Sequence, residues 1–171
     1  MKLTTRKLVV SAVMAALIFV LTFFFQIKLT PQGGYFNLGD TLIYFTAYVL
    51  GGLPAMLAAG IGSMLSDLLS GAAIYAPATL VIKAAMGIVA AIITFKPSFG
   101  RYLIACILGG AIMVVGYGLY DFFVFGLGAM IPDLLGNLFQ WGFGAGIAIL
   151  LFKPAFKLRK TFRFREEPAS K

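Results

Sequence analysis

Long apolar segments recur along the whole chain, and they constrain the fold more than any other feature of the sequence. Segments such as 7–26 and 101–125 are almost entirely apolar, and as helices they can cross roughly 30 Å of hydrocarbon. Charged residues make up 12% of the 171 residues, which is about half the fraction usual in soluble domains. The sequence therefore predicts an all-α, polytopic membrane protein with a single domain over residues 1–171.

Six membrane-spanning segments with short connections account for this apolar pattern. Gly51, Gly52 and Pro54 mark the turn between the second and third segments, and the second is short for a full crossing. A cleaved signal peptide fits the N-terminus less well, because its apolar run is long and no small-x-small cleavage motif follows it. The approximate limits of the six predicted spans are 7–26, 39–51, 54–70, 77–95, 101–125 and 132–152.

The basic residues indicate how the spans are oriented. If both termini are cytoplasmic, the cytoplasmic segments hold 12 of the 14 Lys and Arg residues, and only Lys28 falls in an outer loop. This N-in/C-in arrangement requires an even number of spans and leaves a basic cytoplasmic tail over about 153–171. The tail could suggest nucleic-acid binding, but its place beside a membrane span favours topology and contact with anionic lipid, with no nucleic acid involved.

Ionisable side chains within the predicted spans gather in their outer half. Asp40 is expected at the outer surface, where the second span begins, and Asp67, Lys83 and Asp121 lie near the outer ends of later spans. Such groups are costly within a bilayer and usually face one another or a cavity. Lys83 therefore either pairs with Asp40 or Asp67 and ties helices together, or lines a pocket open to the outside. One ion pair can also do both.

The last predicted span carries a polar stripe on one helical face. Asn137, Gln140 and Trp141 follow Asp133 at positions i+4, i+7 and i+8, and we interpret these three as ligand contacts. Asp133 follows Pro132 at the predicted helix start, which favours an ordinary capping role.

Tyrosines near the outer ends of the spans have two interpretations. Tyr75 and Tyr117 are candidates for the pocket, but tyrosine is also common in the aromatic belt at the membrane interface. The same alternative applies to Tyr120.

Enzymatic chemistry has little support in the sequence. The chain has no histidine, one cysteine (Cys106) and no P-loop motif, so we expect no cofactor, no metal site and no ATP hydrolysis by this chain. Tyr120–Asp121 and the segment 38–40 are similar to the two motifs of intramembrane aspartyl proteases. Their order along the chain is reversed, however, and Asp40 is predicted at a helix mouth, so this enzyme class is only a remote alternative.

Three segments of the chain resemble a family of membrane transport proteins. They are N-L-G-D at 37–40, S-x-x-x-D-L-L-x-G at 63–71 and V-I-K-x-x-x-G at 81–87. They resemble the substrate-binding S components of energy-coupling factor (ECF) vitamin transporters, in the subgroup for hydroxymethylpyrimidine, pyridoxine-type or riboflavin substrates. The resemblance implies an outward pocket built from the first loop and spans four to six. Residues 33–40, including Asn37, would then close the pocket, with Asp40 fixing this lid.

The resemblance also implies partners and a location. S components work with a membrane-embedded coupling subunit and two ATPases, here in a bacterial cytoplasmic membrane. Family members carry small residues at four-residue spacing on the first span to contact the coupling subunit, and this chain has Ala12 and Ala16 there. The alternative is that these two alanines pack inside the helix bundle.

Charge gives some information about the substrate. Four aspartates against one lysine would repel a dicarboxylate such as folate. A small aromatic heterocycle that stacks on Trp141 or a tyrosine fits better, with hydroxymethylpyrimidine or a vitamin B6 form preferred and riboflavin next. An autonomous channel or facilitator is the main rival, but it would need a polar lining through the inner half of the spans, where the sequence is almost purely apolar.

Overall fold

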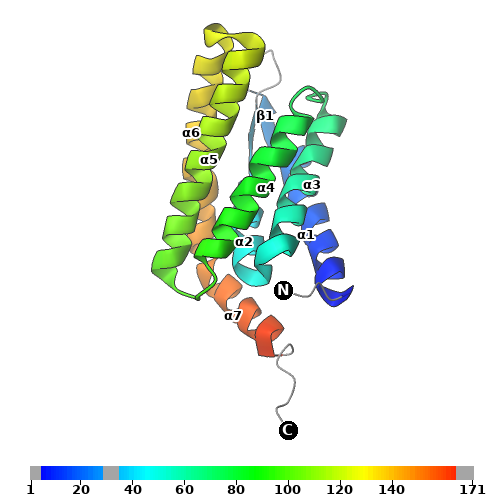
Figure 1. Ribbon diagram of the computed structural model, residues 1–171, viewed down its shortest axis with the longest axis vertical. Coiled ribbons are helices and arrows are strands. Elements are labelled where there is room, and N and C mark those ends of the chain that lie inside the picture. The colour runs from blue at the N-terminus through cyan, green and yellow to red at the C-terminus, as the bar shows by residue number, and fades with distance from the viewer. Residues whose placement is uncertain (1–4, 29–34, 165–171) are drawn as a thin grey trace.

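The computed structural model describes residues 5–28 and 35–164, which form seven α-helices and one small antiparallel sheet (Figure 1). The elements are α1 (Thr5–Phe24), β1 (Gln26–Lys28), β2 (Tyr35–Asn37), α2 (Gly39–Leu50), α3 (Gly52–Ser70), α4 (Ala76–Ile93), α5 (Phe99–Phe125), α6 (Leu127–Leu150) and α7 (Phe152–Phe164).

Four of the helices can each cross a membrane by length and composition, namely α1, α3, α4 and α5. The pair α6 and α7 would add a fifth span, although the two helices meet at a bend of 58°. Helix α2 has 12 residues and rises only about 18 Å, which is too short for a full crossing. The described residues thus support an all-α membrane protein with four or five candidate spans, and six full crossings remain a prediction.

A β-hairpin explains why α2 is short. In Figure 1 the strands lie above α2, between the pair α5 and α6 and the other helices. The register pairs Gln26 with Asn37 and Ile27 with Phe36, and the Phe36 ring packs edge-on against Phe143 of α6, with ring centroids 5.5 Å apart. The strand β2 therefore leads into the bundle before α2 begins, and α2 starts below the hairpin. The hairpin itself was not predicted.

This geometry corrects the predicted position of Asp40. The residue does begin α2, but only 1% of its surface is exposed, so it does not lie at the outer surface. Asn37 Oδ1 accepts a hydrogen bond from the Gly39 N–H at 2.8 Å, which ties the hairpin to the start of the helix. Because α2 starts inside the bundle, its first carboxylate is buried as well.

Helix α3 lies between α1 and α4 at unusually close range. A Cβ atom on Gly62 would stand 2.5 Å from the Ala15 carbonyl oxygen of α1, and one on Gly87 of α4 would stand 2.8 Å from the Ala55 carbonyl oxygen of α3. Only glycine permits these backbones to approach so closely. The three helices therefore form one tightly packed layer.

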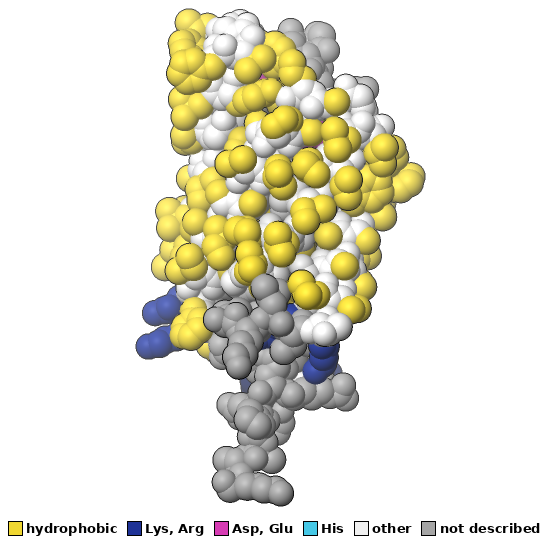
Figure 2. All heavy atoms as spheres, turned by 45° about the vertical axis from the view of Figure 1, so that its right-hand side comes forward, with side chains coloured by type: hydrophobic (Ala, Val, Ile, Leu, Met, Phe, Trp, Pro, Cys, Tyr) yellow, Lys and Arg dark blue, Asp and Glu magenta, His cyan; other side chains and the backbone are white. Residues whose placement is uncertain are grey.

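The surface of the molecule is divided by polarity. Figure 2 shows apolar side chains over the helical body and Lys and Arg side chains only near its lower end. Exposed large apolar residues occur on every long helix, as expected for contact with lipid. In Figure 1 the start of α1 and the end of α7 lie at this same lower end.

Candidate functional site

A pocket opens among α3, α4, α5, α6 and the second strand of the hairpin. About 490 Å³ of space free of protein atoms lies within it, including the part that opens to solvent. Its lining is mostly polar, which is rare inside an apolar bundle. The lining residues are Thr22, Asn37, Ser63, Asp67, Tyr75, Thr79, Lys83, Tyr117, Asp121, Asp133, Gly136, Asn137 and Gln140.

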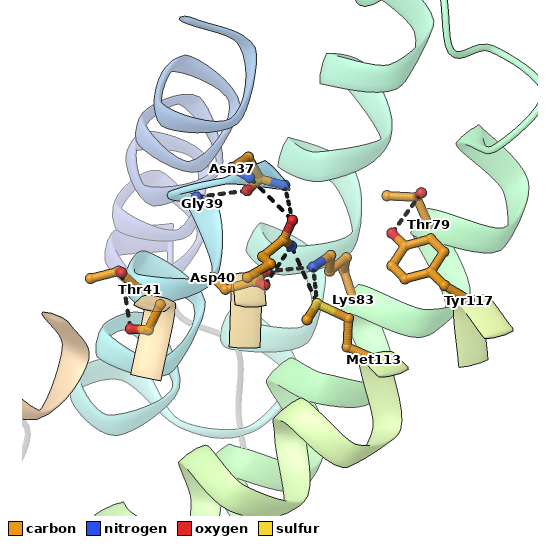
Figure 3. A network of polar contacts seen from close by, with 10 residues as sticks. Asn37, Gly39, Asp40, Thr41, Thr79, Lys83, Met113 and Tyr117 are labelled. Atoms are coloured by element: carbon orange, nitrogen blue, oxygen red, sulfur yellow. Dashed lines mark hydrogen bonds and ion pairs between the residues drawn. The ribbon is translucent and has the colours of Figure 1, made fainter. Parts of the chain in front are cut away.

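A buried ion pair lies at one end of this pocket (Figure 3). Lys83 Nζ of α4 lies 2.5 Å from Asp40 Oδ1 of α2, and both residues are buried. Of the two partners that the sequence left open for Lys83, the structure gives Asp40. The ammonium group also lies 3.0 Å from Met113 Sδ and 5.6 Å from the centroid of the Tyr117 ring, so it is enclosed on several sides.

Gln140 connects the ion pair to the hairpin. Its Nε2 donates to the second carboxylate oxygen of Asp40 at 2.7 Å. Its Oε1 accepts hydrogen bonds from the backbone N–H and the side-chain amide of Asn37, at 3.1 and 3.2 Å. Helix α6, the hairpin and α2 are therefore joined through one amide, whose orientation is fixed by these three contacts and by a fourth from Nε2 to Met113 Sδ at 3.3 Å.

The other end of the pocket is acidic. Tyr75 OH, in the turn before α4, donates to Asp133 Oδ2 at 3.0 Å. Burial, together with the nearby Asp121 and Asp133 carboxylates, raises the pKa of Tyr75 far above its usual value, so the phenol stays a donor. Asp121 is fully buried beside the Tyr75 hydroxyl and the Asp133 carboxylate, and neither of its oxygens has a partner in good hydrogen-bond geometry among the described residues. A buried polar group without a partner is costly, so a ligand donor at this position would relieve the cost.

Asp133 does not cap a helix. Helix α6 begins at Leu127, so Pro132 and Asp133 lie inside it and the predicted start at 132 is wrong. The carboxylate instead lines the pocket and accepts a hydrogen bond from Tyr75 OH.

Comparison with known families decides what kind of protein carries this pocket. A family described as "ECF-type riboflavin transporter, S component" matches residues 2–157. The chain belongs to this family of S components. It is also 32% identical over 122 residues to an uncharacterized protein in the gap 3′ region of Pyrococcus woesei, across 71% of this chain and 82% of that protein. S components are the substrate-binding subunits of transporters rather than enzymes, and they associate with coupling and ATPase subunits.

Eight of the ten residues that the sequence pointed to line the pocket of this S component. They are Asn37, Asp67, Tyr75, Lys83, Tyr117, Asp121, Asn137 and Gln140. The ninth, Asp40, holds Lys83 and Gln140 without lining the pocket itself.

Trp141 differs from the other candidates because its indole does not line the pocket. Trp141 Nε1 donates to the Cys106 carbonyl oxygen of α5 at 2.9 Å. A Cβ atom on Gly110 would overlap the indole, so the ring lies directly against the α5 backbone. Its neighbour Gln140 points toward the pocket, and adjacent helical residues point about 100° apart. The predicted stacking of a ligand on Trp141 is therefore not supported by its position.

The sequence analysis did not single out Thr22, Ser63, Thr79 or Gly136 as lining residues. A signal existed for two of them, because Ser63 and Thr79 each lie four residues before a candidate, Asp67 and Lys83, and thus on the same helical face. Thr79 Oγ1 lies 2.8 Å from Tyr117 OH, which links α4 to α5 beside the pocket.

The S component presents Ala12 and Ala16 on its surface. Both residues are exposed and line an apolar groove between α1 and α3, together with Leu57 and Ile61 of α3. The alternative that these alanines pack inside the bundle is therefore wrong.

Within residues 5–28 and 35–164, no group of three or more His, Cys, Asp or Glu side chains could hold a metal ion.

Proposed function

We propose that this S component captures a small, uncharged heteroaromatic vitamin from the outside and delivers it with a coupling subunit and two ATPases in a bacterial cytoplasmic membrane. The observation that carries the proposal is the buried pocket lined by polar side chains, where the Asp121 carboxylate neighbours Tyr75 but has no partner in good hydrogen-bond geometry among the described residues. Hydroxyl, amino or ring N–H groups of a vitamin are the donors that such a carboxylate binds.

Riboflavin is the first substrate to test, because the matching family is described by it. Hydroxymethylpyrimidine and vitamin B6 forms are the smaller candidates that the sequence favoured. The acidic side chains at one end of the pocket would repel anionic ligands such as folate.

The region below the pocket argues against an autonomous channel. Past Asp40 and Lys83, helices α2, α4 and α5 fill the bundle with Tyr44, Met86 and Tyr102, all fully buried. A solute path through the described residues would have to break the ion pair and displace this core. We therefore propose that release needs a movement imposed by partner subunits.

We propose the groove beside Ala12 and Ala16 as the face that meets the coupling subunit. Both alanines are exposed, and the groove is lined almost entirely by apolar side chains. Small residues at four-residue spacing allow another helix to approach closely.

Substitutions in the pocket test the proposal. Asp121→Asn and Asn137→Ala should each weaken riboflavin binding by about 5- to 150-fold, because each removes hydrogen bonds worth roughly 1–3 kcal/mol. Trp141→Phe is the matched control, since its indole lies outside the pocket. Equilibrium dialysis in detergent gives the affinities, and mass spectrometry of the molecule that co-purifies with the native protein identifies the vitamin. Unchanged riboflavin affinity in both pocket variants would show that riboflavin does not bind in this pocket.

Reporter fusions test the orientation. A reporter after Lys171 should be active in the cytoplasm, and one inserted near Gly128, in the first turn of α6, should be active outside. The distribution of Lys and Arg motivates this expectation. Reversed signals would place the pocket opening on the cytoplasmic side and contradict capture from outside.

A further inference from the structure

Helix α7 is held firmly under the bundle by one buried arginine. Arg159 Nη1 donates to the carbonyl oxygens of Tyr48 at 2.9 Å and Thr94 at 2.6 Å, and its Nη2 donates to that of Phe95 at 2.7 Å. The guanidinium also lies 4.8 Å from the centroid of the Tyr48 ring. These contacts join α7 to α2 and to the C-terminal end of α4, where helix carbonyls favour a cation.

The inner face of α7 repeats at helical spacing. Phe152, Ala155, Phe156 and Arg159 follow at i, i+3, i+4 and i+7 and are buried or half-buried. The Phe152 ring contacts Tyr48, Tyr102 and Phe99, with centroids 5.1–5.4 Å apart. This face of α7 therefore packs against the helix bundle.

The outer face of α7 presents a row of lysines. Lys153, Lys157 and Lys160 follow at i, i+4 and i+7, all three are exposed, and the helix contains no acidic residue. We refer to these three residues as the lysine row. Lys160 also lies over the Phe156 ring, with Nζ 4.6 Å from its centroid. Since the contacts of Arg159 fix the rotation of α7 about its own axis, the lysine row always lies on the same side of the helix.

The lysine row lies at the level where the apolar surface ends. Leu150, three residues before Lys153, is 79% exposed, as expected for a side chain facing lipid tails. Helix α7 then bends away from α6 by 58°. Figure 2 shows Lys and Arg side chains at the lower end of the apolar surface, which is the end where α7 lies in Figure 1. Lipid headgroups occupy this level, just beyond the hydrocarbon.

We propose that the lysine row of α7 binds the phosphate groups of anionic lipid headgroups in the surrounding membrane. The charge is complementary, and the level follows from the apolar boundary at Leu150. An acidic partner protein fits less well. The row starts one helical turn after Leu150, which faces lipid tails, and lipid headgroups are always present at that next level of the membrane. This proposal does not depend on which vitamin the pocket takes.

Native mass spectrometry of the full chain in detergent tests the proposal, with phosphatidylglycerol and phosphatidylcholine as probes. We expect phosphatidylglycerol to bind in preference to phosphatidylcholine. The triple variant Lys153→Gln, Lys157→Gln, Lys160→Gln should lose that preference by on the order of 100-fold, at about fivefold per lysine. The corresponding triple Lys→Arg variant should keep it, which separates charge from damage to the fold.

A second triple variant controls for net charge. Lys2→Gln, Lys96→Gln and Lys171→Gln remove the same charge outside the row and should retain the preference. Equal loss in both Gln triples, or equal binding of the two lipids by the native chain, would overturn the proposal. Displacement of the lipid by millimolar inorganic phosphate would also overturn the proposal, because it would indicate a site for free phosphate. Binding of polyglutamate that depends on the lysine row, without any preference between the two lipids, would overturn it as well, because it would indicate an acidic protein partner.

Discussion

Lys83→Met is expected to destabilise the folded protein by about 3–5 kcal/mol, because it leaves the Asp40 carboxylate buried without its cation. Among the described residues, the carboxylate would keep only its contact with Gln140 Nε2 at 2.7 Å, in a position with 1% exposure. Methionine resembles the lysine side chain in length, so packing changes little. The melting temperature in detergent, or the fraction that stays monodisperse after heating, measures the loss.

A second substitution identifies the partner of Lys83. Adding Asp40→Asn to Lys83→Met should recover most of the lost stability, because no unpaired charge then remains. Adding Asp67→Asn instead is the matched control and should recover little, since the 2.5 Å contact is to Asp40. Rescue by Asp67→Asn alone, or a Lys83→Met protein as stable as the native one, would contradict the ion pair.

Ala12→Trp with Ala16→Trp is expected to reduce ATP-driven uptake by about 10- to 100-fold while vitamin binding in detergent stays intact. Both alanines are exposed in the α1–α3 groove, and neither lines the pocket. Two indoles there would clash with a closely packed partner helix, at a cost of about 1.4–2.8 kcal/mol in total. Uptake by the reconstituted complex and co-purification of the coupling subunit are the two measurements.

The same helix provides the control for this experiment. Val13→Trp with Leu17→Trp has the same spacing, and both residues are exposed on α1 outside the groove, so uptake should persist. A parallel fall of binding and uptake in the alanine variant would show damage to the fold rather than lost docking. Full uptake with both tryptophans in the groove would contradict the docking face.

Much of the fold could be predicted from apolar length, because a lipid environment permits few alternatives for a long apolar segment. The predicted spans at 7–26, 54–70, 77–95 and 101–125 overlap α1, α3, α4 and α5 closely. The hairpin and the depth of α2 could not be predicted, since they depend on contacts such as Asn37 with Gln140, 103 residues apart. The start of α6 was misplaced because Pro132, normally a helix-start signal, lies inside the helix.

The site could be predicted to the extent that buried polar residues are rare in apolar helices. That rule pointed to Lys83, Asp121 and Gln140, all of which line the pocket. It could not tell the two sides of α6 apart, because Gln140 and Trp141 are adjacent and both carry polar atoms. Trp141 instead donates to the Cys106 carbonyl, a contact that Gly110 permits and that spacing alone does not reveal.

Uptake of radiolabelled riboflavin into proteoliposomes tests the central proposal most directly. One set of vesicles contains this chain alone, and the other contains it with the coupling subunit and two ATPases. If the chain is a capture subunit closed below by Asp40, Lys83 and the core, it should bind riboflavin alone but accumulate none, and uptake should appear only with the partners and ATP. Accumulation by the chain alone without ATP would contradict this role and indicate a facilitator.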